Sequence, residues 1–208
     1  MFPRGRQHFL LPLLGAFATA RFKVIEKNSE KTDAWKSTLE RLLPLWGHRN
    51  WIVIADAAYP AQSNPGIETI ATGADHLEVL RATLDAIDNS KHVKTKIYLD
   101  AEYRLVAEQD APGVTTYRQK LARLTGGRDT ETIRHDEVIA KLDQSGRLFR
   151  ILILKSKLTI PYTSVFLELD CGYWNQDAEK RLRRSMDRSK LRRNGAVREN
   201  PAAFDNQL

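Results

Sequence analysis

Residues 47–60 read GHRNWIVIADAAYP, and the centre of this stretch is the most informative part of the sequence for the fold. Its apolar run, Trp51 to Ile54, is rich in β-branched side chains and is followed by small residues and a proline. A run of this kind is typical of a strand that is buried on both faces, as in a parallel sheet. The stretch therefore predicts an α/β fold with this strand near its centre.

A histidine and an aspartate flank the predicted strand. Asp56 follows its carboxyl end, where open α/β sheets place ligand-binding groups, and His48 lies in the preceding loop. Imidazole gives and takes protons near neutral pH, because its unperturbed pKa is about 6.5. We therefore expect the two side chains to share a pocket. Two simpler explanations stay open, with Asp56 as the cap of a following helix and His48 as a solvated loop residue.

The rest of the chain alternates helix and strand signals. Apolar spacing predicts helices that end near residue 43, begin at the capping-box sequence 72–75, and cover residues 117–124 and 135–142. Strands are expected at residues 93–99, 148–154 and 164–169. This alternation predicts a single domain with a mainly parallel central sheet covered by helices. We expect His76 and His92 to lie at its surface.

The formal net charge of +7 at pH 7 comes from the two ends of the chain. Residues 1–23 include four basic and no acidic residues, and residues 173–208 include nine basic and five acidic ones. The middle of the chain is nearly neutral, so we expect no nucleic-acid partner. Residues 173–208 have few apolar side chains and are predicted to form a basic, partly disordered tail. Binding of nucleic acid or acidic lipid by this tail stays open as an alternative, although no aromatic residue is interleaved among its arginines.

The ends and the cysteine content bear on the cellular compartment. The single cysteine, Cys171, excludes an intrachain disulfide and a cysteine-based zinc cluster. Residues 1–37 form an N-terminal extension, in which an apolar stretch from Phe9 to Phe17 precedes the small-x-small sequence of residues 18–20. This stretch is too short to span a membrane. We predict a cytoplasmic protein, with export through a cleaved signal at residues 1–20 as the alternative.

The sequence lacks the motifs of several cofactor-dependent chemistries. It has no Gly-rich phosphate loop of the dinucleotide or P-loop type, no paired-cysteine motif and no His-Glu-x-x-His zinc motif. We therefore expect neither a metal nor a cofactor.

Three motifs in order give the chain a resemblance to a known family. They lie at residues 47–61, at residues 134–137 (RHDE) and at residues 161–165 (PYTSV). Together they resemble the motifs of the ribose pyranase and fucose mutarotase family over roughly residues 38–172. The resemblance implies a compact α/β subunit in a ring-like homo-oligomer with sites at subunit contacts. It also implies that the protein interconverts ring forms of a free, ribose- or fucose-like monosaccharide without a cofactor.

The resemblance assigns roles to individual residues. The family's catalytic histidine corresponds to His48, and its sugar-binding aspartate corresponds to Asp56. His135 corresponds to a second histidine of the pyranase branch, and the family's sugar-binding Tyr-x-Asn segment corresponds to Tyr162-Thr163-Ser164. On this basis His48 transfers protons, while Asp56, His135 and residues 162–164 bind the sugar.

Two functional hypotheses from different classes follow. The first is a cofactor-independent isomerase, in which one group takes the proton of the anomeric hydroxyl while another protonates the ring oxygen. The second is a non-catalytic sugar-binding or regulatory relative. It is suggested by two departures from the family pattern. Ser164 replaces an asparagine and removes a carboxamide that donates and accepts hydrogen bonds, and residues 157–160 lack the acidic or arginine residues of family members.

Overall fold

A six-stranded sheet organises the residues that the computed structural model describes, which are 34–198, with the backbone alone for 191–198. The strand order is β2-β5-β1-β6-β3-β4. The strands are β1 (Trp51–Ala55), β2 (Ile67–Ala71), β3 (Val93–Asp100), β4 (Thr130–Ile133), β5 (Ile151–Lys155) and β6 (Val165–Cys171). β6 runs antiparallel to both of its neighbours, while the other pairs are parallel. The prediction of a mainly parallel sheet is confirmed.

The predicted central strand, β1, is buried along its whole length. It pairs in parallel with β5 and antiparallel with β6, so it has neighbours on both edges as well as cover on both faces. The apolar run from Trp51 to Ile54 is explained by this position, because a polar side chain there would lose its contact with water on either face of the sheet.

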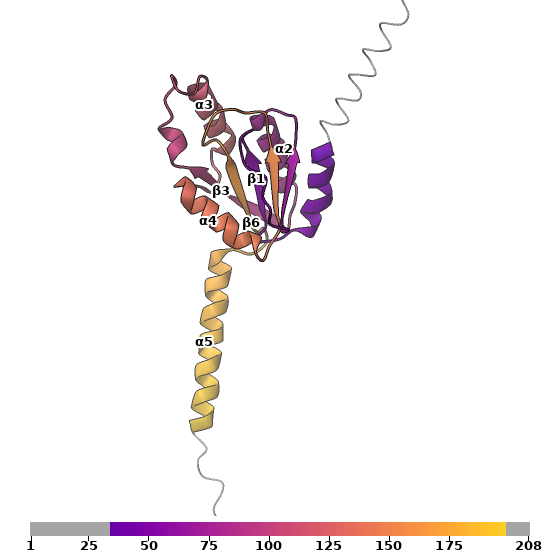
Figure 1. Ribbon diagram of the computed structural model, residues 1–208. Helices are drawn as coiled ribbons and strands as arrows, with labels where there is room; N and C mark the ends of the chain where they lie inside the picture. The colour runs from indigo at the N-terminus through magenta and orange to yellow at the C-terminus, as the bar shows by residue number, and fades with distance from the viewer. Residues whose placement is uncertain (1–33, 199–208) are drawn as a thin grey trace, which may run out of the picture.

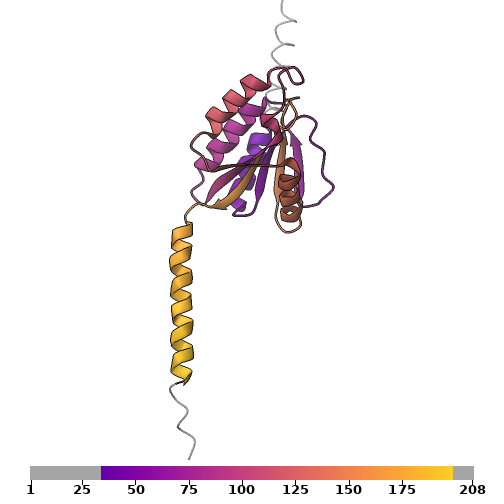
Figure 2. The same ribbon diagram turned by 90° about the vertical axis from the view of Figure 1, so that its left-hand side faces the viewer.

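Helices cover both faces of the sheet (Figures 1 and 2). One face packs against α2 (His76–Asp88), α3 (Val114–Thr125) and a helix at residues 34–42. The other face packs against α4 (His135–Gly146), chiefly through Val138 and Leu142. Two short 3-10 turns complete the regular structure, η1 (Leu43–Leu45) and η2 (Glu102–Arg104).

The N-terminal boundary of the domain differs from the prediction. Trp35 is 1% exposed and belongs to the main apolar core, together with Leu39 and Leu43. The domain therefore includes residues 35–37 of the predicted N-terminal extension. Pro44 ends the preceding helix as expected, because it has no backbone N–H for a further helical hydrogen bond.

The sequence does not predict the two edge strands, and the predicted starts of β5 and α2 differ from those in the structure. β2 and β4 lie at the two edges of the sheet with mostly exposed or half-buried residues, so neither has an apolar run. β5 begins at Ile151, and Leu148 in the loop before it is 80% exposed. The N-cap of α2 is Asp75, whose carboxylate accepts hydrogen bonds from two backbone N–H groups, rather than Thr72.

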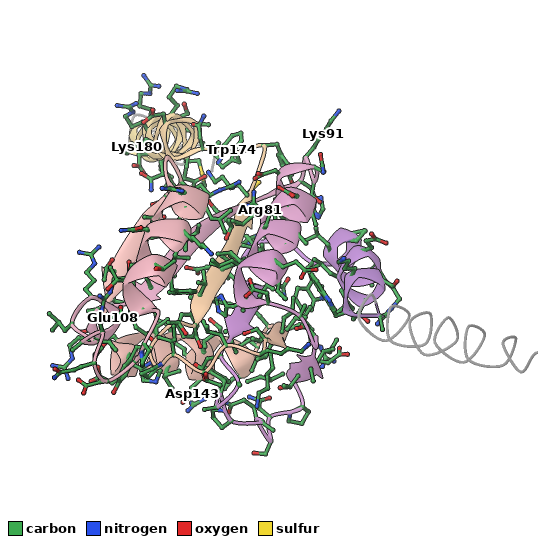
Figure 3. All side chains as sticks on the ribbon, turned by 90° about the horizontal axis from the view of Figure 1, so that it is seen from above. Arg81, Lys91, Glu108, Asp143, Trp174 and Lys180 are labelled. Atoms are coloured by element: carbon green, nitrogen blue, oxygen red, sulfur yellow. The ribbon has the colours of Figure 1, made fainter. Side chains whose placement is uncertain are left out.

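The C-terminal segment also differs from the predicted disordered tail, since residues Gln176–Arg198 form the helix α5. Asn175 caps its first turn, and Glu179 accepts hydrogen bonds from Trp174 and Arg183. α5 extends away from the sheet as a separate rod (Figures 1 and 2), with Trp174 beside its first turns (Figure 3). Local capping and i,i+4 pairs favour this helix, although the segment has too few apolar side chains to form a core of its own.

We expect α5 to contribute little to the stability of the domain. Leu182 and Met186 remain 45% and 44% exposed, so the helix buries little apolar surface. A chain ending at Asn175 should unfold within about 2 °C of the full chain in a thermal melt, because surface contacts typically contribute only about 0.5 kcal/mol. A loss of several degrees would show that α5 packs on the domain.

None of the helices over residues 34–198 combines the length and apolar character needed to cross a bilayer. The signal predicted at residues 1–20 lies outside the described residues.

Candidate active site

Four neighbouring strands bring polar side chains to one end of the sheet. This row of strand ends includes the carboxyl end of β1 and is called the carboxyl edge. β1, β3 and β4 end there, and β6, which runs the opposite way, begins there. The residues that follow or end these strands are Asp56, Asp100 and His135, and the residues preceding β6 are 162–164. This edge is the position at which α/β sheets carry their ligand sites.

Asp56 is held by a local turn and by the segment before β6. Its Oδ1 accepts a hydrogen bond from the backbone N–H of Ala58 at 2.8 Å. Its Oδ2 accepts one from the Ser164 hydroxyl at 3.0 Å, and that hydroxyl in turn lies 3.3 Å from the Asp56 backbone N–H, which donates to it. No helix starts between Asp56 and His76, so the alternative of Asp56 as a helix cap is excluded.

Asp100 and His135 form a second polar pair at the same edge. The Asp100 side chain, at the end of β3, is 1% exposed, and its Oδ2 lies 3.0 Å from Nδ1 of His135. Burial raises the pKa of the Asp100 carboxyl to about 6, while the His135 ring acts in the opposite direction. The His135 side chain is 40% exposed, so the pair joins a buried carboxylate to a ring that solvent reaches.

Tyr162 completes the polar wall around His135. Its ring lies edge-on to the imidazole, with ring centroids 5.6 Å apart and planes at 82°. Tyr162 has a φ of 56°, a left-handed backbone conformation that is uncommon for a residue with a Cβ and is found often at functional sites. Glu102 fixes the other side by accepting the backbone N–H of His135 at 3.0 Å.

Thr163 and Ser164, which are predicted to contact the sugar, are buried, and their hydroxyls bond within the protein. Thr163 is 1% exposed, and its hydroxyl donates to the Ile160 carbonyl. Ser164 is 2% exposed and its hydroxyl is bonded to Asp56. Thr163 and Ser164 therefore support the neighbouring site residues through buried hydrogen bonds, and neither hydroxyl lies at the surface.

A buried relay supports this segment from the core. The Tyr117 hydroxyl donates to the Thr163 carbonyl at 3.0 Å and lies 3.3 Å from Nδ1 of His76. The other ring nitrogen of His76, Nε2, lies 3.2 Å from the Ile54 carbonyl, to which it donates. The prediction that His76 lies at the surface is therefore wrong, since it is 0% exposed and links β1 to the segment before β6. His92 is half-buried, and its Nε2 lies within hydrogen-bond distance of the carbonyls of Leu43 and Trp46.

His48 lies at the opposite edge of the sheet from Asp56, so the prediction that they share a pocket within one chain is wrong. Both residues flank β1, and five residues of strand span roughly 16 Å. The two residues lie beyond opposite ends of this buried strand, so they do not converge. The exposed His48 faces a different environment, a cleft of about 960 Å³ that also includes Arg49, Lys96 and Trp174.

Sequence reasoning missed Asp100 and His76, although each carried a signal. Asp100 ends an alternating strand, which is the same position that drew attention to Asp56. His76 stands four residues before Leu80 and eight before Leu84, on the apolar face of the predicted helix. Over residues 34–198, no group of three or more His, Cys, Asp or Glu side chains is arranged to hold a metal ion.

The sequence matches the model of the RbsD / FucU transport protein family over residues 30–168. The chain belongs to this family. The match with the RbsD / FucU model includes β1 to β5 and ends within β6, so α5 lies beyond it. Among proteins with curated descriptions, none matches the sequence.

Two solved structures from the RbsD / FucU family are similar to this chain. One is RbsD of Bacillus subtilis complexed with D-ribose, with 20% identity, a TM-score of 0.47, and coverage of 64% of this chain and 92% of that one. The other is the fucose mutarotase of Streptococcus pneumoniae in complex with L-fucose, with 21% identity, a TM-score of 0.42, and coverage of 62% and 89%.

Proposed function

We propose that the protein is a cofactor-independent monosaccharide isomerase that interconverts the anomers or the pyranose and furanose forms of a free, ribose- or fucose-like sugar. The observation that carries the proposal is the meeting of Asp56, the Asp100–His135 pair and Tyr162 at the carboxyl edge of the sheet in a member of this family. Carboxylates accept hydrogen bonds from sugar hydroxyls, and an imidazole exchanges protons near neutral pH.

Ring opening requires two proton transfers, one at the anomeric hydroxyl and one at the ring oxygen, and two groups share them in this proposal. One group removes the proton of the anomeric hydroxyl, and the other protonates the ring oxygen as its bond to the anomeric carbon breaks. We assign His48 to one of these transfers and the binding of the sugar to Asp56, His135 and Tyr162. Thr163 and Ser164 support the binding residues from beneath.

His48 reaches this site only from a second copy of the chain. The two ends of β1 point in opposite directions, so a head-to-tail contact places the His48 edge of one subunit against the Asp56 edge of the next. Repeating such a contact closes a ring when the rotation between neighbouring subunits divides a full turn, and a ring is the assembly that the family resemblance implies. The proposal therefore includes a homo-oligomer whose sites lie between subunits.

Saturation-transfer NMR on a panel of free aldoses tests the activity directly, because it reports exchange between ring forms at equilibrium. We expect the protein to accelerate exchange of at least one ribose- or fucose-like sugar above the buffer rate, and Asp56→Asn to weaken sugar binding because it removes the charge and one acceptor. A protein that binds monosaccharides without raising the exchange rate would support the non-catalytic relative instead.

A further inference from the structure

The Asp100 carboxylate occupies a position that is unfavourable for folding. Its side chain is 1% exposed and its Oδ1 is buried without a hydrogen-bond partner among residues 34–198. Glu102 and Asp56 add negative charge nearby, and the burial itself raises its pKa. A buried, incompletely bonded carboxylate costs stability, and a neutral side chain of the same shape commonly restores it. Packing alone therefore does not explain an aspartate here.

The partner that Asp100 does have is the ring of His135. A carboxylate only accepts hydrogen bonds, so the 3.0 Å contact requires Nδ1 of His135 to carry the proton. Nε2 of the neutral ring is then unprotonated, and its lone pair can accept a proton. The Tyr162 ring lies edge-on to the imidazole, and the backbone N–H of His135 donates to the Glu102 carboxylate.

We propose that Asp100 is a positioning residue that fixes the tautomer of His135 and stabilises its protonated form, so that Nε2 of His135 performs one of the two proton transfers. This proposal rests on the proposed function and deepens it, since it makes His135 a proton-transfer group as well as a sugar-binding one. His48 of a second copy then performs the other transfer.

The proton balance is complete with these two groups. In the opening direction, Nε2 of His135 takes the proton of the anomeric hydroxyl, the oxygen's electron pair forms the carbonyl, and the ring C–O bond breaks. The released ring oxygen takes a proton from His48. Closure reverses both transfers and restores the starting states, so neither an oxidant nor a cofactor is needed. Asp100 stays ionised beside the imidazolium and does not itself take the proton.

Asp100→Asn separates this role from a structural one, because the two predict opposite changes in stability. We expect the variant to melt at a higher temperature than the wild type, since the buried charge is gone. We expect its kcat for ring exchange to fall by about tenfold or more with little change in KM, because a neutral amide does not stabilise the imidazolium. A lower Tm with proportionate loss of folded protein, or a kcat within about twofold of wild type, would overturn the proposal.

A second measurement does not depend on activity. The ¹⁵N shifts of the His135 ring, recorded near neutral pH without sugar, should show the Nδ1–H tautomer in the wild type and loss of that preference in Asp100→Ala. Asp136→Asn is the matched control, since this neighbouring carboxylate is exposed and pairs with Arg134. An unchanged tautomer in Asp100→Ala would refute the positioning role. A wild type that shows the tautomer but exchanges no sugar would instead reject the proposed function.

Discussion

His48→Ala is expected to slow ring exchange by roughly 10² or more, since a positioned acid or base contributes about that factor. The side chain lies in an exposed loop and is not part of either apolar core, so the variant should fold and melt as the wild type does. Exchange rates by NMR and a thermal melt on the same sample check both halves of this expectation. A variant with the wild-type rate would remove His48 from the chemistry.

The separation of His48 from Asp56 allows a sharper form of the same experiment. If each site combines His48 of one subunit with Asp56 of the next, then mixing His48→Ala with Asp56→Asn and reassembling the subunits restores some intact sites. Random mixing of equal amounts in a head-to-tail ring restores about one quarter of them. If each site lay within one chain, the mixture would stay as inactive as its parts.

Sedimentation at micromolar concentration should show an oligomer, and a purely monomeric wild type would contradict the shared site.

The second large effect concerns the pH dependence of stability and centres on His76. Burial lowers its pKa from 6.5 to about 4 in the folded protein, because the ring cannot be solvated when charged. Between these two values the unfolded chain binds a proton at His76 and the folded chain does not. The contribution of the neutral His76 to the free energy of unfolding is therefore fully present above about pH 6.5, and it is lost as the pH falls towards 4. The loss amounts to about 3 kcal/mol.

His76→Gln removes this titration and should reveal it by comparison. The amide still donates to the Ile54 carbonyl, but the variant loses the imidazole packing and should be less stable than the wild type at pH 7. That deficit should shrink by about 3 kcal/mol between pH 7 and pH 4 in urea denaturation. Tyr117→Phe is the matched control, because it breaks the same relay without removing a group that titrates in this range. A deficit for His76→Gln that stays constant with pH would contradict the assignment.

Asp100 acts in the opposite direction over much of the same range, which is why differences between variants are needed. Its pKa of about 6 in the folded protein lies above the usual value for a carboxyl group. The folded chain therefore binds the proton first, and Asp100 adds stability as the pH falls. In the wild type this gain masks part of the loss at His76, so the stability of the wild type alone does not reveal either group.

The α/β class of the fold and three of the polar residues at the carboxyl edge, Asp56, His135 and Tyr162, could be predicted from the sequence, whereas Asp100 was missed. β1 and β3 carry patterns that follow directly from their surroundings, an apolar run for a strand covered on both faces and alternation for one with a wet face. Asp56 was placed correctly at the carboxyl end of β1, because strand direction follows from chain direction. Edge strands such as β2 carry no such pattern, since half-exposed positions accept polar and apolar residues alike.

Which of these residues meet depends on the tertiary structure. Asp56 and Ser164 are 108 positions apart, and Asp100 and His135 are 35 apart, yet both pairs bond at one edge. His48 and Asp56, only eight positions apart in the printed sequence, lie at opposite ends of a strand. A buried strand converts a short separation in sequence into a long one in space, whereas strand pairing brings distant segments together. That order of pairing depends on how the whole core packs, which no local pattern of residues records.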